Sequence, residues 1–360
     1  MRKYYTMSRP CFCGSEVMFK KCHKNRKVTG EEFAKYIYQV RADKDQMCLH
    51  PSAPLTCTPK ILNAHTIQRK GPLKYLIDED NHLGQMNAFG ENDVIRVGWR
   101  RASTFRGFCT AHDKEMFQII EDEKFKGRVE QVLVAGYRAY AFEYYKKMDN
   151  LRVLLPYYDY ADFEDERLAN QLTQMVEGTR YGEGNMRSCL DEYKKGLESK
   201  NYEDICSVII YFTGDLCVAV CGAFAPDFLI DGNRIRPIDS EIQDLSINSL
   251  VTEDGHAVVF SWPKENEVCN KFILSIIKYP ETEIPSILVE VIFRFIENVF
   301  FSIDWYDALS SKQKENIKGL ASNGGIRFED LHALVPSKEK YVNWEITEID
   351  LTPFSRTPNW

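Results

Sequence analysis

The sequence predicts a multidomain α+β protein. Its 360 residues exceed the usual size of a single domain. Six of the 11 cysteines lie in the first third of the chain, whereas the C-terminal part alternates apolar, strand-like runs with helical patterns. We therefore expect N-terminal cysteine- and histidine-rich modules, a helical linker region, and a C-terminal antiparallel sheet with helices. The expected segments are residues 1–28, 29–114, 115–200 and 201–360.

The N-terminal segment contains three cysteines and a histidine at close spacing. Cys11 and Cys13 precede Gly14 and Ser15, which suit a tight turn, and Cys22 and His23 follow after a short interval. Three thiols and an imidazole form a four-ligand set that tetrahedral zinc prefers. The pattern resembles the SEC-C zinc module, which ends the SecA translocation motor and is attached to many other proteins. This resemblance implies one structural zinc ion and docking to a partner.

Positive charge is concentrated around this module. Residues 1–30 carry eight Lys and Arg residues and one acid, Glu16, whereas the whole chain has a net charge of −7. A basic module on an acidic body can contact an anionic partner such as nucleic acid. The same charge can equally offset the zinc thiolates. The sequence favours neither interpretation.

A second group of cysteines and histidines follows. Its two halves enclose a long polar insertion, Gln68 to Arg96, and the second half begins a helical pattern. A treble-clef zinc site combines ligands in this way and is closed by a helix that carries the last ligand. The candidate ligands are Cys48, Cys57, Cys109 and His112, with His50 as a substitute for one of them.

This second region resembles an HNH-type nuclease module. Asn63-Ala64-His65 stands where the family has a histidine that activates water against a phosphodiester, and Asp113 follows the closing knuckle. The resemblance implies that His65 is the general base and that Asp113 binds Mg²⁺ or Mn²⁺. Ala64 departs from the family, which usually has a metal ligand there, and the loop between the halves is longer. From the residues alone, a histidine at a strand end is more often structural or a zinc ligand than catalytic.

Basic side chains accompany His65 and can bind phosphates. Acidic residues alternate with them, so the sequence predicts no continuous basic surface. The basic residues are Arg69, Lys70, Lys74, Arg96, Arg100, Arg101 and Arg106, and the acidic ones are Asp78, Glu79, Asp80, Glu91 and Asp93.

Residues 115–200 have a helical pattern. Gly127 is expected to separate two helical segments, and Gly182 with Gly184 to interrupt a later one. Apolar and aromatic residues recur at helical spacing from Val129 to Tyr145, which predicts a core or helix-pairing face.

The C-terminal part is expected to fold as an antiparallel sheet with helices on one side. A hairpin is predicted around Thr213-Gly214-Asp215, and a second strand pair joins 244–250 to 257–262. Helices are predicted at 266–278, 285–302 and 310–322. The apolar run 208–212 indicates burial on both faces of the sheet or in an interface. The five later cysteines are interpreted as core residues: Cys189, Cys206, Cys217, Cys221 and Cys269.

No secretory signal or membrane span is predicted. The basic N-terminus lacks an apolar region, and the most apolar stretch, 284–303, is interrupted by Glu290, Arg294 and Glu297. We therefore expect a cytoplasmic protein with reduced thiols and no membrane partner.

Two functions of different classes follow from these patterns. In the first, the protein is a zinc-containing HNH-like endonuclease that acts on DNA or RNA, with the SEC-C module for docking, as in bacterial defence against phage. In the second, two structural zinc ions stabilise a non-catalytic adaptor, which binds a protein partner or the ribosome through SEC-C.

Overall fold

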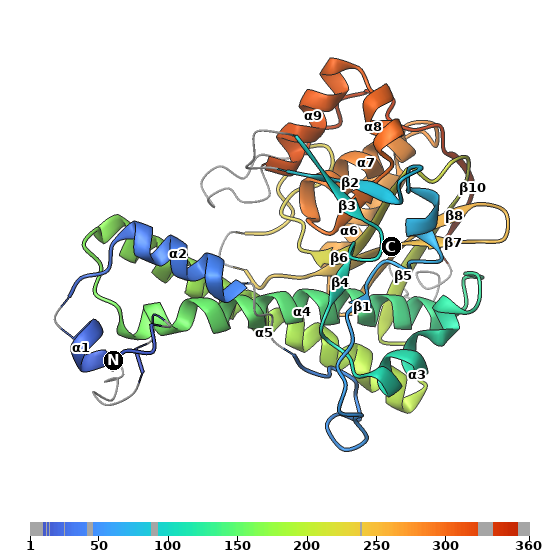
Figure 1. The fold of residues 1–360 in the computed structure, drawn as a ribbon. Coiled ribbons are helices and arrows are strands. Elements are labelled where there is room, and N and C mark those ends of the chain that lie inside the picture. The colour runs from blue at the N-terminus through green and yellow to red at the C-terminus, as the bar shows by residue number, and fades with distance from the viewer. Residues whose placement is uncertain are drawn as a thin grey trace. The chain divides into compact units, whose positions relative to one another are not determined.

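The computed structural model describes residues 10–11, 13, 15–24, 26–41, 46–87, 93–237, 240–322 and 334–351 (Figure 1). Helices and antiparallel strands occur together, which confirms the predicted α+β class. The chain groups into two compact units, each made of two segments. The smaller unit contains Met1–Met47 and Glu143–Arg187, and the larger contains Cys48–Phe142 and Ser188–Trp360. The four segments expected from the sequence stay a prediction.

The smaller unit is built from helices. A capping box begins α2 (Gly30–Arg41), because the Thr29 hydroxyl accepts from the backbone N–H of Glu32 and the Glu32 carboxylate accepts from that of Thr29, both at 3.2 Å. Phe33 and Tyr36 on α2 contact the ring of Tyr157, with centroids 4.9 and 4.5 Å apart. These rings form a core between α2, the later part of α4 (Val129–Tyr160) and the first part of α5 (Glu166–Ser199).

Glycines affect the helices in two different ways. Gly127 has a φ of +71° and separates α3 (Thr110–Glu121) from α4, as predicted. The predicted interruption at Gly182 and Gly184 is wrong, because α5 runs through both without a break. A glycine in a helix interior costs only about 1 kcal/mol, which the surrounding turns of a 34-residue helix outweigh.

An eight-stranded antiparallel sheet forms the centre of the larger unit. Its strand order is β10-β5-β8-β7-β6-β9-β2-β3. The strands span His82–Met86 (β2), Val94–Gly98 (β3), Ile205–Thr213 (β5), Val218–Phe224 (β6), Leu245–Val251 (β7), His256–Pro263 (β8), Val299–Phe301 (β9) and Glu345–Asp350 (β10). All five later cysteines are buried, as expected for core thiols.

The hairpin predicted around Gly214 is wrong. β5 pairs with β8 and β10, whereas β6 pairs with β7 and β9, so the predicted β7–β8 hairpin lies between the two strands. Both strands are buried almost throughout, and apolar runs without alternation do not specify which neighbour a strand pairs with. The chain turns away at Gly214, where φ is +96°, and the indole N–H of Trp344 donates to the Asp215 carbonyl at 2.8 Å.

Helices cover both faces of the sheet, not one as predicted. Side chains alternate between faces along a strand. The Ser261 hydroxyl on β8 accepts from Tyr193 on α5 at 2.7 Å, whereas the neighbouring Trp262 donates to Asn270 on α6 (Glu267–Ile277) at 2.8 Å. This double cover explains why β5, β6 and β8 are apolar along nearly their full length.

The predicted helix at 285–302 is too long. α7 spans Ile284–Phe295, and Val299–Phe301 then forms β9, since β-branched and aromatic residues suit a strand between β6 and β2. α6 and α9 (Ser311–Ser322) confirm the other two predicted helices, and a short α8 (Ile303–Ala308) precedes α9. In the part of the chain that the structure describes, none of the helices combines the length and apolarity that a membrane crossing requires.

The polar insertion between the halves of the second cysteine region is part of this sheet. It forms a short 3₁₀ helix, Pro72–Tyr75, followed by β2 and β3. Gly84 of β2 pairs with Phe301 of β9 and leaves room for the Phe301 ring. Leu73, Leu76 and Leu83 are fully buried, so a few apolar residues bind this charged segment to the core.

Candidate metal centres

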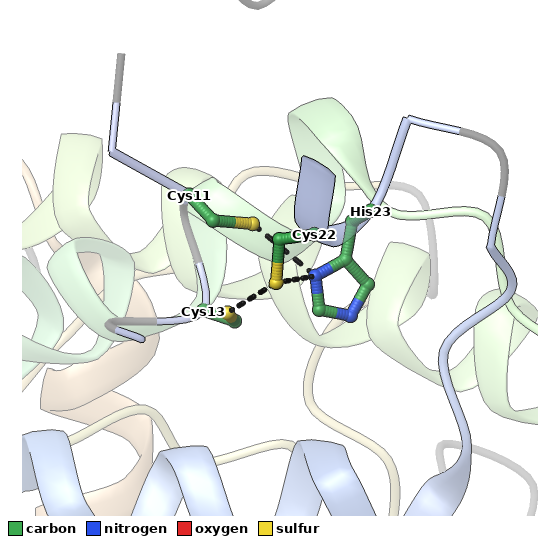
Figure 2. A group of neighbouring side chains, drawn as sticks. All are labelled: Cys11, Cys13, Cys22 and His23. Atoms are coloured by element: carbon green, nitrogen blue, oxygen red, sulfur yellow. Dashed lines mark hydrogen bonds between the residues drawn. The ribbon is translucent and has the colours of Figure 1, made fainter. Parts of the chain in front are cut away.

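Four side chains of the N-terminal module converge in the smaller unit (Figure 2). The backbone N–H of Cys11 donates to the Val17 carbonyl at 2.7 Å, which folds the chain back on itself. Cys11 and Cys13 lie on the first arm of this turn. Cys22 ends the four-residue helix α1 (Phe19–Cys22), and His23 follows as its C-cap. Gly14, expected at the turn, lies outside the described residues.

The spacing of these donor atoms fits a tetrahedral metal ion. Cys11 Sγ and Cys22 Sγ lie 3.2 and 3.1 Å from His23 Nδ1, and Cys13 Sγ lies 3.6 Å from Cys22 Sγ. Around a zinc ion with Zn–S bonds of about 2.3 Å, neighbouring sulfurs are about 3.8 Å apart and sulfur–nitrogen pairs about 3.5 Å. All four donor atoms lie within 4.8 Å of one another.

The surroundings of the first cluster shift the pKa values of its donors. Burial raises the pKa of the Cys11 thiol to about 12, because its side chain packs in the aromatic core of the smaller unit. Burial favours a higher pKa for the Cys13 thiol as well. Hydrogen bonds with the Ser15 hydroxyl and backbone outweigh this effect and lower the pKa. Burial and then the charge of Arg26 lower the pKa of His23, which keeps its imidazole neutral, as a metal ligand requires.

The second cluster lies where a strand pair meets a helix in the larger unit. β1 (Ala64–His65) pairs with β4 (Thr104–Phe105), and Ile61 bridges Cys109, the N-cap of α3. The Leu49 backbone N–H donates to the Gly107 carbonyl at 2.8 Å and places Cys48 beside Cys109. The sequence thus builds a β–β–α unit from β1, β4 and α3, with cysteines at its open end.

The donor atoms of this cluster also converge. Cys48 Sγ and Cys57 Sγ lie 3.3 and 3.6 Å from His112 Nδ1, and the Cys109 backbone N–H donates to Cys48 Sγ at 3.4 Å. The Thr56 hydroxyl lies 2.8 Å from His112 Nε2, so it can orient the ring with Nδ1 toward the sulfurs. Cys48, Cys57, Cys109 and His112 all lie within 4.8 Å of one another and can hold a metal ion.

The thiols of the second cluster differ in acidity. Burial favours the protonated form of Cys109, but hydrogen bonds from Thr58 and from the His112 backbone outweigh it and lower its pKa to about 6. Desolvation, followed by the neighbouring Cys48, raises the pKa of Cys57 to about 11. Cys109 is therefore the thiol that can first bind a cation as a thiolate at neutral pH.

His50 lies beside the second cluster. Its ring stacks on that of His112 with centroids 3.9 Å apart, and its Nδ1 accepts from the Ser52 backbone N–H at 3.1 Å. It also forms a group of close donor atoms with His112 and Glu115. The four-donor set above contains Cys57 and His112 rather than His50, so the geometry favours His50 as a neighbour of the cluster.

His65 and Asp113, expected to be catalytic, lie on β1 and in the first turn of α3. Burial, followed by the charges of Arg69 and Arg138, lowers the pKa of His65 to about 4. Its Nε2 atom is buried and has no hydrogen-bond partner among the described residues. Burial, followed by Glu121, raises the pKa of Asp113 to about 6. Neither residue belongs to a group of three or more close His, Cys, Asp or Glu donors among the residues that the structure describes.

Sequence reasoning missed Arg138 and Thr56, and it assigned Ser15 to a tight turn without expecting its hydrogen bond with Cys13. Arg138 stands in the apolar stripe of α4 between Tyr137 and Ala139, where a charged residue is the only signal, and its side chain is 2% exposed. Thr56 and Ser15 immediately precede or closely follow cysteines, a position in which hydroxyls often support metal ligands.

No protein-family model, curated protein or solved structure matches this chain significantly. Its function is therefore inferred from the arrangement of its own residues.

Proposed function

We propose that both clusters hold zinc. Zinc favours four-coordinate sites of cysteine thiolates and histidine nitrogens, and each cluster offers three sulfurs and one Nδ1 at tetrahedral spacing. A bound zinc ion would balance the negative charge of the thiolates and join the chain segments that carry the ligands at each site. The first site would stabilise the arms of the SEC-C-like module, and the second would join the start of α3 to the loop that carries Cys48 and Cys57.

The function that this arrangement supports best is that of an HNH-like endonuclease. The observation that carries the proposal is the β–β–α unit, closed by four donor atoms, with a neutral histidine on its first strand. His65 would accept a proton from water, the water oxygen would bond to phosphorus, and one phosphorus–oxygen ester bond would break, with the departing sugar oxygen taking up a proton from solvent. Asp113 is the proposed carboxylate ligand for Mg²⁺ or Mn²⁺, which often take further ligands from water and phosphate.

Basic side chains close to His65 would contact the nucleic acid. The Arg69 guanidinium lies over the Trp99 ring, 5.5 Å from its centroid, and Arg100 and Arg101 are exposed in the turn that follows β3. The carbonyls of Trp99 and Arg100 interact with the His65 ring, so this turn lies beside the proposed base. Arginines and an aromatic face are typical contacts for phosphates and bases of DNA or RNA.

A non-catalytic adaptor is the second candidate, and two observations favour it. Ala64, where HNH proteins usually have a metal ligand, is buried, and the Nε2 atom of His65 is buried as well. In this case the SEC-C-like module would bind a protein partner or the ribosome, and the second cluster would only stabilise the fold. Defence against phage in bacteria remains the setting proposed for the nuclease.

The two candidates make different predictions for purified protein incubated with plasmid DNA and with RNA. With Mg²⁺ or Mn²⁺ present, we expect cleavage that falls at least about 100-fold in His65→Ala, because a general base typically contributes that much or more. His82→Ala, a histidine variant on β2, is the control and should cut normally. Zinc content and circular dichroism check that both variants are folded. No cleavage with any metal, from protein that contains two zinc ions, would support the adaptor.

The nucleic-acid face is tested by charge reversal. Arg100→Glu with Arg101→Glu should weaken binding about 10-fold or more at low salt and make the salt dependence of binding shallower, since fewer counterions are released. The control reverses Arg167 and Lys271, two exposed residues that are distant in sequence from the β–β–α unit. Fluorescence anisotropy with labelled DNA and RNA measures both. Equal loss in the two double variants would indicate an effect of net charge alone.

A further inference from the structure

Arg138 connects the two elements that carry the proposed site. Its Nη1 donates to the carbonyl oxygens of His65 and Thr66 at 3.1 and 3.3 Å. The same nitrogen lies 3.2 Å from a carboxylate oxygen of Glu121 at the end of α3. Its guanidinium carbon also lies 4.2 Å from the centre of the Phe117 ring on α3. One side chain from α4 therefore holds β1 and α3 together directly beside His65.

Burying this charge is energetically costly. The Arg138 side chain is 2% exposed, whereas its carboxylate partner Glu121 is 33% exposed. Its Nε and Nη2 atoms are buried and have no partner among the described residues. Removing a charge from water costs several kcal/mol unless its partners compensate fully, and replacing a buried ion pair by apolar residues is often neutral or stabilising. A role beyond packing accounts for an arginine here.

We propose that Arg138 is a positioning residue for the reaction proposed above: it fixes the backbone of His65, and with it the direction of the imidazole. The inference rests on the proposed function. Its positive charge adds a second effect, because it disfavours a positive charge on the imidazole and so helps to keep the His65 ring unprotonated before the reaction, the state that a general base starts from. Arg69, in the turn after β1, also lowers the pKa of His65, and the Trp99 and Arg100 carbonyls act in the opposite direction.

Two substitutions separate position from charge. Arg138→Lys keeps the charge but loses the planar donors, whereas Arg138→Gln loses the charge. We expect Arg138→Lys to lower kcat about 10- to 100-fold with KM within about twofold, since a small misplacement of a reacting group costs this much. In Arg138→Gln the acidic limb of the kcat–pH profile should also move up by about one pH unit. Arg128→Gln, an exposed arginine near the start of α4, is the matched control.

Nuclear magnetic resonance of the His65 ring provides a readout that does not depend on cleavage. The wild-type ring should stay neutral down to about pH 5, and the ring in Arg138→Gln should begin to protonate between about pH 5 and 6. If Arg138→Gln does not fold, Glu121→Gln loosens the same contact from a half-exposed position and should lower kcat severalfold. Unchanged kcat in Arg138→Lys, or an unchanged pH profile and ring titration in Arg138→Gln, would overturn the proposal. If the wild type cleaves no nucleic acid, but the His65 ring still protonates at higher pH in Arg138→Gln than in the wild type, the nuclease proposal is refuted. The effect of Arg138 on His65 would then still stand.

Discussion

At the scale of single residues, Cys109 shows how a thiol is prepared for a cation. It is the N-cap of α3, where the helix dipole stabilises negative charge, and hydrogen bonds lower its pKa to about 6 despite its burial. Cys109→Ser should therefore reduce the metal content from about two ions per chain to about one, because serine is a much weaker ligand for zinc. Elemental analysis measures this loss. Cys189→Ala, which changes a buried thiol of the larger unit, should retain both ions.

His256 predicts a dependence of stability on pH. Its side chain is 1% exposed between Phe212 and Trp344, and burial lowers its pKa from 6.5 to about 4. Between these pH values the unfolded chain binds a proton that the folded protein does not, so the free energy of unfolding falls as pH falls. This histidine alone accounts for up to roughly 3 kcal/mol.

The measurement compares urea unfolding of the wild type and of His256→Phe at several pH values from 7 to 4.5. Phenylalanine fits the aromatic neighbours and has no titrating group. We expect a weaker loss of stability on acidification in the variant. Equal pH dependence in the two proteins would mean that the pKa of His256 is the same in the folded and unfolded states, which would contradict the prediction.

The donor residues of both clusters could be proposed from the sequence, whereas their supporting residues could not. Cysteine and histidine at short spacing restrict the chemistry to few possibilities, so the eight candidate donors could be named, with His50 as an alternative at the second cluster. Arg138 contacts the carbonyl of His65, 73 positions away in the sequence. Such a contact depends on how α4 packs, which no local pattern specifies.

At the scale of elements, replacing each of two glycines by alanine should change the stability of the protein in opposite directions. At Gly127, φ is +71° and a Cβ atom would lie 2.2 Å from the Tyr211 hydroxyl, so Gly127→Ala should destabilise the protein by about 2 kcal/mol. Gly184 lies inside α5 with no atom near the position of a Cβ, so Gly184→Ala should stabilise it by about 0.5–1 kcal/mol. Denaturant unfolding of both variants tests the pair, and a change of the same sign in both would contradict it.

The elements were more predictable than their pairing. The helical patterns of α6 and α9 and the turn between β7 and β8 are local, and each was found where expected. β5 and β6 are consecutive but not adjacent, because the β7–β8 hairpin lies between them. Strands buried on both faces carry no alternation that identifies a partner, so topology depended on contacts distant in sequence.

At the scale of the whole molecule, metal removal should act locally. The eight-stranded sheet has its own apolar core, whereas the segments around the two clusters contain α1, β1 and β4, which are short, and the 12-residue α3. After chelation, hydrogen exchange should accelerate in residues 15–24, 48–65 and 104–112, while β7 and β8 remain protected. Mass spectrometry locates the exchange along the chain. Loss of protection throughout the sheet, or no change near the clusters, would contradict this expectation.

The division of α4 and α5 between the two units has a practical consequence for shortened versions of the protein. The smaller unit draws on residues at the N-terminus and on 143–187, an excursion from the larger unit that leaves through one helix and returns through the other. Deleting residues 1–47 would remove Phe33 and Tyr36 from their contacts with Tyr157 and Phe163. The apolar side chains that they cover would then be exposed to water. Such a fragment should aggregate or bind chaperones. A phenotype of that deletion would therefore report damage to the remaining protein rather than the function of the deleted segment.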